Sequence, residues 1–259
     1  MNNGPAPNPA WILPEWPGVP RQVRALTTRR TGGIGIGAFT SFNLAQHVGD
    51  EPATVAEHRR MLQAKAGMPA EPLWLEQVHG THVVEHPGRV PDTPPRADAA
   101  VALAPGRVCV VMTADCLPVV FTDRAGTRVG VAHAGWRGLA GGVLEATIAA
   151  LRVPAPELLA WLGPALSQPA FEVGPEVRDA FVAQSAANET AFVPNARGRF
   201  QADLYALARM TLARAGVDRV SGGGRCTYAE DREFYSYRRD GGATGRMATC
   251  VWIDGHTGS

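Results

Sequence analysis

The chain has 259 residues, of which 45% are hydrophobic and 19% are charged, with 25 Lys and Arg against 24 Asp and Glu. This composition is that of a globular protein with a sizeable core, and it excludes wholesale disorder. The formal net charge of +1 excludes an overall field that would recruit nucleic acid or an anionic membrane surface.

The N-terminal segment, the lack of long apolar stretches and the cysteines indicate the cellular compartment of the protein. The first twenty residues are interrupted by prolines and lack a basic segment followed by a long apolar run, so they do not resemble a secretory signal. No later stretch is apolar enough to span a bilayer. The four cysteines form no CxxC pair and no dense disulfide framework. We therefore expect reduced thiols, a cytoplasmic protein and no membrane partner.

The first quarter of the chain predicts an arm, a loop and a helix. Residues 1–20 are typical of an extended, proline-rich N-terminal arm, and residues 21–259 are expected to form a single domain. The stretch TTRRTGGIGIGAFTSFNL is punctuated by glycines but lacks the phosphate-loop and dinucleotide motifs, so we expect no requirement for nicotinamide, flavin or ATP. Apolar periodicity predicts a helix over Pro52–Ala66, which Gly67 ends.

The rest of the chain predicts buried strands followed by helices. Short β-type segments are expected in LWLEQVHGTHVVEH, and continuous apolar runs typical of strands buried on both faces occupy Val108–Met112, Leu117–Phe121 and Arg128–Ala132. Helices are expected over Gly138–Leu151, Pro175–Ala187 and Leu204–Ala215, and a final strand over Ala248–Ile253. Because strands and helices alternate irregularly, the pattern predicts one domain of mixed α and β structure.

Three short segments concentrate residues that can ligate a metal: QVHG, TADCLP and AHAGWRG. Each places a histidine or cysteine at the end of a predicted buried strand. Zinc takes imidazole nitrogen and thiolate sulfur, and a catalytic site keeps three protein ligands with a fourth position open. His79, Cys116 and His133 would supply such a set.

The same residues allow two other interpretations. Cys116 could be a nucleophilic thiolate activated by a histidine, and the three side chains could equally be a buried cysteine and histidines bonded to backbone. Asp115 could orient a histidine, act as a general acid or base, or cap its turn. The residue types alone leave these alternatives open.

Several longer blocks, in order along the chain, carry a family resemblance. They include SFNLAQHVGDEP, QVHGTHVV, ADAAVALAPGRVCVVMTADCLPVVFTD, GVAHAGWRGLAGGVLEAT and CTYAEDREFYSYRRDGGATGR. From about Thr27 to Ile253 the chain resembles the laccase-domain, YfiH-like family, also described as multicopper polyphenol oxidases or peptidoglycan editing factors. One departure lies in the first predicted helix, where His58–Arg59 stand in place of an expected asparagine before arginine, and we expect it to affect only the helix surface.

The resemblance implies a fold and a chemistry. It implies an α+β fold with mixed β-sheets packed together and helices outside, distantly shared with the deamidase domain of cytotoxic necrotizing factor. It implies one zinc per chain, on His79, Cys116 and His133. It also implies phosphorolysis of adenosine, inosine, guanosine and methylthioadenosine, and hydrolytic deamination of adenosine. Its partners would then be a purine nucleoside and phosphate, with no nucleic acid, and the oligomeric state is left open.

Other residues in these blocks are expected to serve that chemistry. We expect Asp115 to carry a proton beside Cys116. Phosphate is best held by the bidentate fork of arginine, and the arginines concerned are Arg30, Arg137 and Arg238. Arg137 could instead only bond the carbonyls of its own turn. Asn43 and His47 could hydrogen-bond the base or ribose, or serve only to shape their loop.

Two competing functions remain from the sequence. A cell-wall hydrolase acting on a muropeptide precursor would use Cys116 as nucleophile or the metal as Lewis acid. A copper polyphenol oxidase would need several coppers and many histidines, whereas the chain has seven histidines and no HxH motif. Zinc is therefore the expected metal, and copper is the less favoured alternative.

Overall fold

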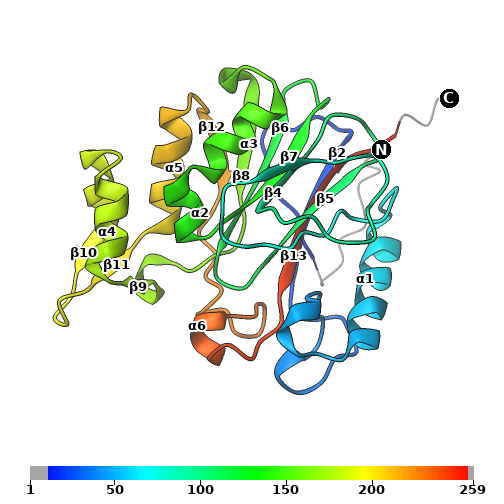
Figure 1. Cartoon of the computed structure of the whole chain (residues 1–259), viewed down its shortest axis with the longest axis horizontal. Helices are drawn as coiled ribbons and strands as arrows, with labels where there is room; N and C mark the ends of the chain where they lie inside the picture. Colours follow the sequence, from blue (N-terminus) through cyan, green and yellow to red (C-terminus); the bar gives the residue numbers. More distant parts are fainter. Residues whose placement is uncertain (1–10, 256–259) are drawn as a thin grey trace.

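Two β-sheets pack face to face and carry helices on their outer sides in the computed structural model, which describes residues 11–255 (Figure 1). The first sheet has the order β1-β2-β13-β5, formed by β1 (Trp11–Ile12), β2 (Val23–Thr28), β13 (Met247–Ile253) and β5 (Val108–Thr113). The second has the order β12-β8-β6-β7-β4-β3, with β12 (Arg219–Gly222), β8 (Leu158–Leu162), β6 (Leu117–Asp123), β7 (Val129–Ala134), β4 (Ala99–Ala102) and β3 (Val83–Glu85).

Alternation along the central strands explains why both faces of each sheet are buried. Along β5, Cys109 and Val111 face the second sheet, while Val108 and Val110 belong to the cluster on the opposite side. Successive side chains of a strand point to opposite faces, so a continuous apolar run is what a strand between two apolar layers requires. The prediction that the central apolar runs are strands buried on both faces is therefore confirmed.

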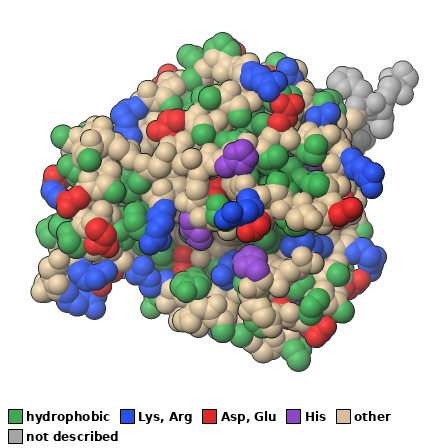
Figure 2. Space-filling model, viewed as in Figure 1, with side chains coloured by type: hydrophobic (Ala, Val, Ile, Leu, Met, Phe, Trp, Pro, Cys, Tyr) green, Lys and Arg blue, Asp and Glu red, His purple; other side chains and the backbone are tan. Residues whose placement is uncertain are grey.

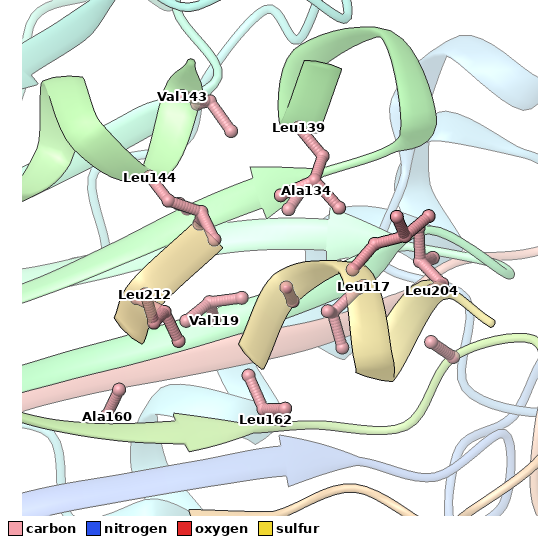
Figure 3. Close-up of a cluster of buried hydrophobic side chains, with 14 of the residues drawn as sticks. Leu117, Val119, Ala134, Leu139, Val143, Leu144, Ala160, Leu162, Leu204 and Leu212 are labelled. Carbon is pink, nitrogen blue, oxygen red and sulfur yellow. The ribbon is translucent and has the colours of Figure 1, made fainter. Parts of the chain in front are cut away.

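The outer layers are helical. α1 (Pro52–Ala66) covers the first sheet, where Leu62 and Ala66 pack with Trp252. α2 (Trp136–Gly141), α3 (Val143–Leu151) and α5 (Leu204–Arg214) cover the second sheet, where Figure 3 shows Leu144 and Leu212 packed over Val119. α4 (Pro175–Val182) and a small sheet, β10 (Phe192–Pro194), β11 (Phe200–Ala202) and β9 (Glu172–Val173), lie at one end of the molecule, and α6 (Tyr237–Asp240) precedes β13 (Figure 1). This confirms the α+β fold with packed sheets and helices outside, in which the first sheet is antiparallel and the second is mixed.

The structure corrects two predicted helices. The helix expected over Gly138–Leu151 is two helices, because Gly142 adopts φ +99° and its N–H caps the end of α2. A left-handed residue cannot continue a right-handed helix, and glycine adopts that conformation without a steric penalty. The helix expected over Pro175–Ala187 ends at Val182, and the chain turns extended at Ser185.

The N-terminal arm is only partly within the described region. Residues 1–10 of the predicted arm lie outside it, whereas Trp11–Ile12 pair with Thr27 and Thr28 of β2. Within residues 11–255, no helix combines the length and the apolar character needed to cross a membrane.

Candidate metal centre

The structure brings His79, Cys116 and His133 together. One ligand atom from each lies within 4.8 Å of the others, and Cys116 Sγ lies 3.9 Å from His79 Nε2. Strand pairing explains part of this arrangement, because Leu117 of β6 pairs with Ala134 of β7 and Pro118 pairs with His133. Cys116, directly before β6, is thereby held beside the histidine of the neighbouring strand.

Two turns at the site have uncommon backbone conformations. His79 has φ +59° and Asp115, next to Cys116, has φ +94°. Positive φ is uncommon for residues other than glycine, and it persists where the surrounding structure fixes it. Here it allows the loop before β3 and the turn between β5 and β6 to point their ligand side chains at one another.

Asp98 holds both histidine segments. Its fully buried carboxylate accepts hydrogen bonds from the backbone N–H groups of Val78, His79 and Gly80 at 3.2, 2.9 and 2.7 Å. It also accepts one from Nδ1 of His133 at 2.8 Å. Because Nδ1 of His133 is engaged in this way, its Nε2 is the nitrogen left to bind a metal.

The electrostatics of the cluster favour a thiolate. Burial raises the pKa of Cys116, but the charge of His133 and hydrogen bonds from His133 and His79 outweigh it, so the pKa lies below its usual value. Burial lowers the pKa of His133, but the charge of Cys116 and the hydrogen bond to Asp98 bring it above its usual value. A thiolate is the form in which cysteine binds a metal or attacks as a nucleophile.

The donor set fits a single zinc ion. With Zn–S near 2.3 Å and Zn–N near 2.1 Å, a tetrahedral ion separates sulfur and nitrogen ligands by about 3.6 Å. The 3.9 Å between Cys116 Sγ and His79 Nε2 is close to that value. Two imidazoles and a thiolate are also suitable copper ligands, so the donor types alone do not choose between the two metals.

A cavity of about 420 Å³ opens over the three side chains. Its walls include four other residues expected from the sequence: His47, Asp115, Arg137 and Arg238. Apolar surface comes from residues such as Leu166, Phe171 and Leu204. Figure 2 shows basic and histidine side chains gathered near the middle of one face of the molecule.

Arg30 and Asn43, also expected to bind substrate, are not among the residues that line this cavity. The Arg30 guanidinium donates to the backbone carbonyls of Thr40 and Asp231 and lies 4.8 Å from the centroid of the Tyr235 ring. Asn43 is fully buried and bonds backbone and Asp50, so its contacts shape the loop that carries His47.

His58 differs from the expectation of a helix-surface position. Its ring is fully buried, with Nδ1 2.8 Å from the carbonyl oxygen of Asn43 and Nε2 accepting from the N–H of Ile34 at 3.0 Å. His58, the residue that departs from the family pattern, therefore lies beneath the loop of Asn43, because this side of α1 faces the protein interior.

Both carboxylate oxygens of Asp115 accept a hydrogen bond. Thr227 donates to Oδ1 at 2.6 Å and the backbone N–H of Arg238 donates to Oδ2 at 2.7 Å. These bonds fix the turn before Cys116 against the start of α6, which places Arg238 at the cavity. These contacts therefore indicate that Asp115 positions Cys116 and Arg238 at the cavity.

Sequence reasoning missed three residues of the site. Gln77 lines the cavity and exchanges two 2.8 Å hydrogen bonds with the backbone of Met112. Arg246 also lines the cavity. Asp98 does not line it but accepts the hydrogen bond from Nδ1 of His133. All three stand in the blocks QVHG, GGATGR and ADAAV, so the family blocks marked them, but no local pattern distinguished them from their neighbours.

Comparisons with known proteins agree with this architecture. Residues 24–254 match the family described as multi-copper polyphenol oxidoreductase laccase. The chain is 55% identical over 246 residues to purine nucleoside phosphorylase PA4543 of Pseudomonas aeruginosa, covering 94% of this chain and 98% of that protein. It is 50% identical over 242 residues to purine nucleoside phosphorylase YfiH of Escherichia coli K12, covering 93% and 98%.

Solved structures show the same fold. The Neisseria meningitidis protein NMB0706 superposes with a TM-score of 0.90 at 50% identity, covering 95% of this chain and 100% of that one. YlmD from Geobacillus stearothermophilus also gives a TM-score of 0.90, at 27% identity, covering 95% and 97%. By the extent of these matches, the chain belongs to the YfiH-like family described as multi-copper polyphenol oxidoreductase laccases.

Proposed function

We propose that the chain is a zinc-dependent purine nucleoside phosphorylase that also deaminates adenosine. The observation that supports it is the cluster of His79, Cys116 and His133 at a cavity of about 420 Å³ that three arginines line. The names of the relatives from P. aeruginosa and E. coli support the phosphorylase activity. Its substrates would be adenosine, inosine, guanosine or methylthioadenosine, together with phosphate.

Zinc fits the site better than several coppers. Within residues 11–255, His79, Cys116 and His133 form the single group of three or more potential ligands. A laccase-type centre needs several coppers and many more histidines than this group provides. When bound, zinc would supply a Lewis acid that activates water at neutral pH.

The cavity suits a nucleoside in size and lining. Its volume lies within the range of about 300–1,000 Å³ usual for small-molecule sites. Phe171, Leu166 and Leu204 offer apolar surface against which a purine ring can pack. Arg137, Arg238 and Arg246 offer positive charge from which a phosphate site can be built, and His47 offers a hydrogen-bonding group for the ribose or phosphate.

Phosphorolysis needs no redox partner. A phosphate oxygen attacks C1′ of the ribose, the bond from C1′ to N9 breaks, and the purine leaves with the bonding electron pair and takes up a proton. The chain's contribution is to hold the two reactants in line and to place positive charge beside the phosphate.

One observation favours a second candidate. The lowered pKa of Cys116 beside two histidines also suits a thiolate nucleophile, as in a hydrolase that edits a peptidoglycan precursor. Such an enzyme would form an acyl-thioester at Cys116, whereas the phosphorylase would form no covalent adduct there.

Metal analysis and product analysis test the proposal together. We expect about one zinc per chain, and free base with ribose 1-phosphate from inosine only when phosphate is present. Adenosine without phosphate should yield inosine. Cys116→Ala should remove most of the metal and suppress both reactions while the fold is retained. Several coppers per chain, or wild-type turnover by Cys116→Ala, would contradict the proposal, and an acyl-enzyme would favour the hydrolase.

A further inference from the structure

Arg246 differs from the other two arginines that line the cavity. Its side chain is half-buried, whereas Arg137 and Arg238 are exposed. Its Nη1 donates to the carbonyl oxygens of Thr244 and Gly245 at 2.7 and 3.0 Å. These two bonds fix the guanidinium group relative to the backbone that leads into β13.

The guanidinium of Arg246 lies 5.8 Å from the centroid of the Tyr237 ring, and its edge opposite the two carbonyls has no hydrogen-bond partner among the described residues. Within residues 11–255, no hydrogen bond reaches its Nε or Nη2, and no carboxylate lies within ion-pair distance of it. An arginine that is half-buried without a counter-ion carries a desolvation cost that an anionic ligand would offset. The two N–H groups on this edge match two oxygens of a phosphate.

The wall that holds Arg246 also holds His47. Oδ1 of Asn43 accepts hydrogen bonds from the N–H of Arg246 at 2.9 Å and from the N–H of Ala45 at 3.0 Å. The N–H of Leu44 donates to the carbonyl oxygen of Arg246 at 3.4 Å. Asn43 therefore fastens the loop of His47 to the segment of Arg246, which gives this buried asparagine its role.

The charges at this wall are suited to an oxyanion. Burial, followed by the positive charges of Arg246 and Arg59, lowers the pKa of His47, so its imidazole is neutral at pH 7 and offers one N–H donor. Burial also lowers the pKa of Arg246, against the opposing effect of Cys116 and Asp115. Arg246 thus lies within electrostatic reach of both His47 and the turn that carries Cys116.

We propose that Arg246 and His47 form the phosphate subsite of the cavity, with Nε and Nη2 of Arg246 binding two phosphate oxygens and His47 donating to a third. This assignment rests on the proposed phosphorylase function. It places phosphate at the wall between α1 and β13, next to the candidate metal centre. Arg238 donates to the carbonyl of Glu172 and lies 5.8 Å from the centroid of the Phe171 ring, so it lies near the apolar surface of the cavity.

The test compares Arg246→Gln with a matched control. Nη1 of Arg128 also donates to two backbone carbonyls, those of Leu103 and Thr127 at 3.0 and 2.9 Å, and this half-buried side chain is not part of the cavity lining. Arg246→Gln should raise the KM for phosphate about ten- to a hundredfold, as expected for loss of a charge-assisted contact. Its KM for inosine, and its phosphate-independent deamination of adenosine, should change several-fold less than its KM for phosphate, and Arg128→Gln, outside the cavity, should match wild type in all three.

Direct binding separates this assignment from the proposed function. Calorimetric titration with inorganic phosphate should show binding to the wild type and to Arg128→Gln, and weakened binding to Arg246→Gln and His47→Ala. Should Arg246→Gln fail to fold, Arg246→Lys replaces it, since lysine keeps the charge but loses the two-donor edge. Phosphate binding that is unchanged in these variants, or absent in the wild type, would overturn the subsite. Arg246-dependent phosphate binding without any ribose 1-phosphate from nucleosides would keep the subsite and reject the phosphorylase.

Discussion

Asp98 is the side chain on which the geometry of the two histidines depends. Its carboxylate accepts three backbone N–H groups from the loop of His79 and the Nδ1–H of His133. A carboxylate offers only acceptors, so it can serve four donors at once. The loop of His79 and the strand of His133 are thereby oriented by one carboxylate.

We predict that Asp98→Asn weakens metal binding about ten- to a hundredfold, the usual effect of losing such an outer hydrogen-bond partner. The new amide NH2 cannot accept from the loop N–H groups or from His133, so at least one buried donor loses its partner. Zinc affinity would be measured by competition with a chromophoric chelator, on protein that is first shown to be folded.

Asp123→Asn is the matched control for that variant. Asp123 is also buried and accepts hydrogen bonds from the N–H and hydroxyl of Thr127 and the N–H of Arg128, in the turn between β6 and β7. This control should lower Tm without changing zinc affinity. Equal zinc affinities for Asp98→Asn and wild type would show that the histidines are positioned without Asp98.

At the level of elements, the turn from β7 to α2 controls how closely the chain approaches the cysteine. Gly135 lies directly after this strand, and a Cβ there would lie 2.8 Å from Cys116 Sγ and 3.2 Å from His79 Cδ2. Its φ of −62° is open to any residue, so lack of space rather than backbone conformation calls for glycine here.

Gly135→Ala should therefore displace the thiolate and weaken zinc binding by at least about tenfold, while changing Tm only slightly. Gly80→Ala is the control, because its Cβ would meet its nearest neighbour, Oδ2 of Asp98, at an ordinary 3.5 Å. The d–d absorption of the cobalt-substituted protein would report the ligand geometry of both variants. A wild-type spectrum for Gly135→Ala would show that the site adapts to the added methyl group.

At the level of the whole molecule, the candidate metal centre lies where the two packed sheets are connected. The turn of Cys116 connects β5 of the first sheet to β6 of the second, and His133 stands on β7 of the second sheet. His79 comes from the loop before β3, so an ion bound there would link three segments that are distant in sequence. An ion that binds the folded state but not the unfolded state stabilises the fold.

Removal of the metal should accordingly lower Tm by several degrees. At a free metal concentration one hundred times Kd, bound metal contributes about 2.7 kcal/mol. Differential scanning calorimetry with and without a chelator would measure the shift, and Cys116→Ala should show none. An equal Tm for the metal-loaded and metal-free wild type would exclude this contribution to stability.

The sequence by itself determined the central strands, most helices and the identity of the three candidate ligands. Val108–Met112 and Leu117–Phe121 are continuous apolar runs, and the need to bury both faces of such strands leaves little choice of structure. The helix predicted from Pro52 to about Ala66 is confirmed, because a proline starts the helix and a left-handed glycine ends it. His79, Cys116 and His133 were marked by residue type and family blocks.

Only the tertiary structure decided what surrounds those ligands. Asp98 lies 35 residues from His133, and Asn43 lies 203 residues from Arg246, so no local periodicity links the members of either pair. Arg30 and Arg246 both stand in glycine-rich segments, and nothing in those segments distinguishes their roles. Arg30 donates to backbone carbonyls outside the cavity, whereas Arg246 lines the cavity. A side chain's role depends on which strands pair and which loops they bring together, and these contacts exist only once the two sheets have packed.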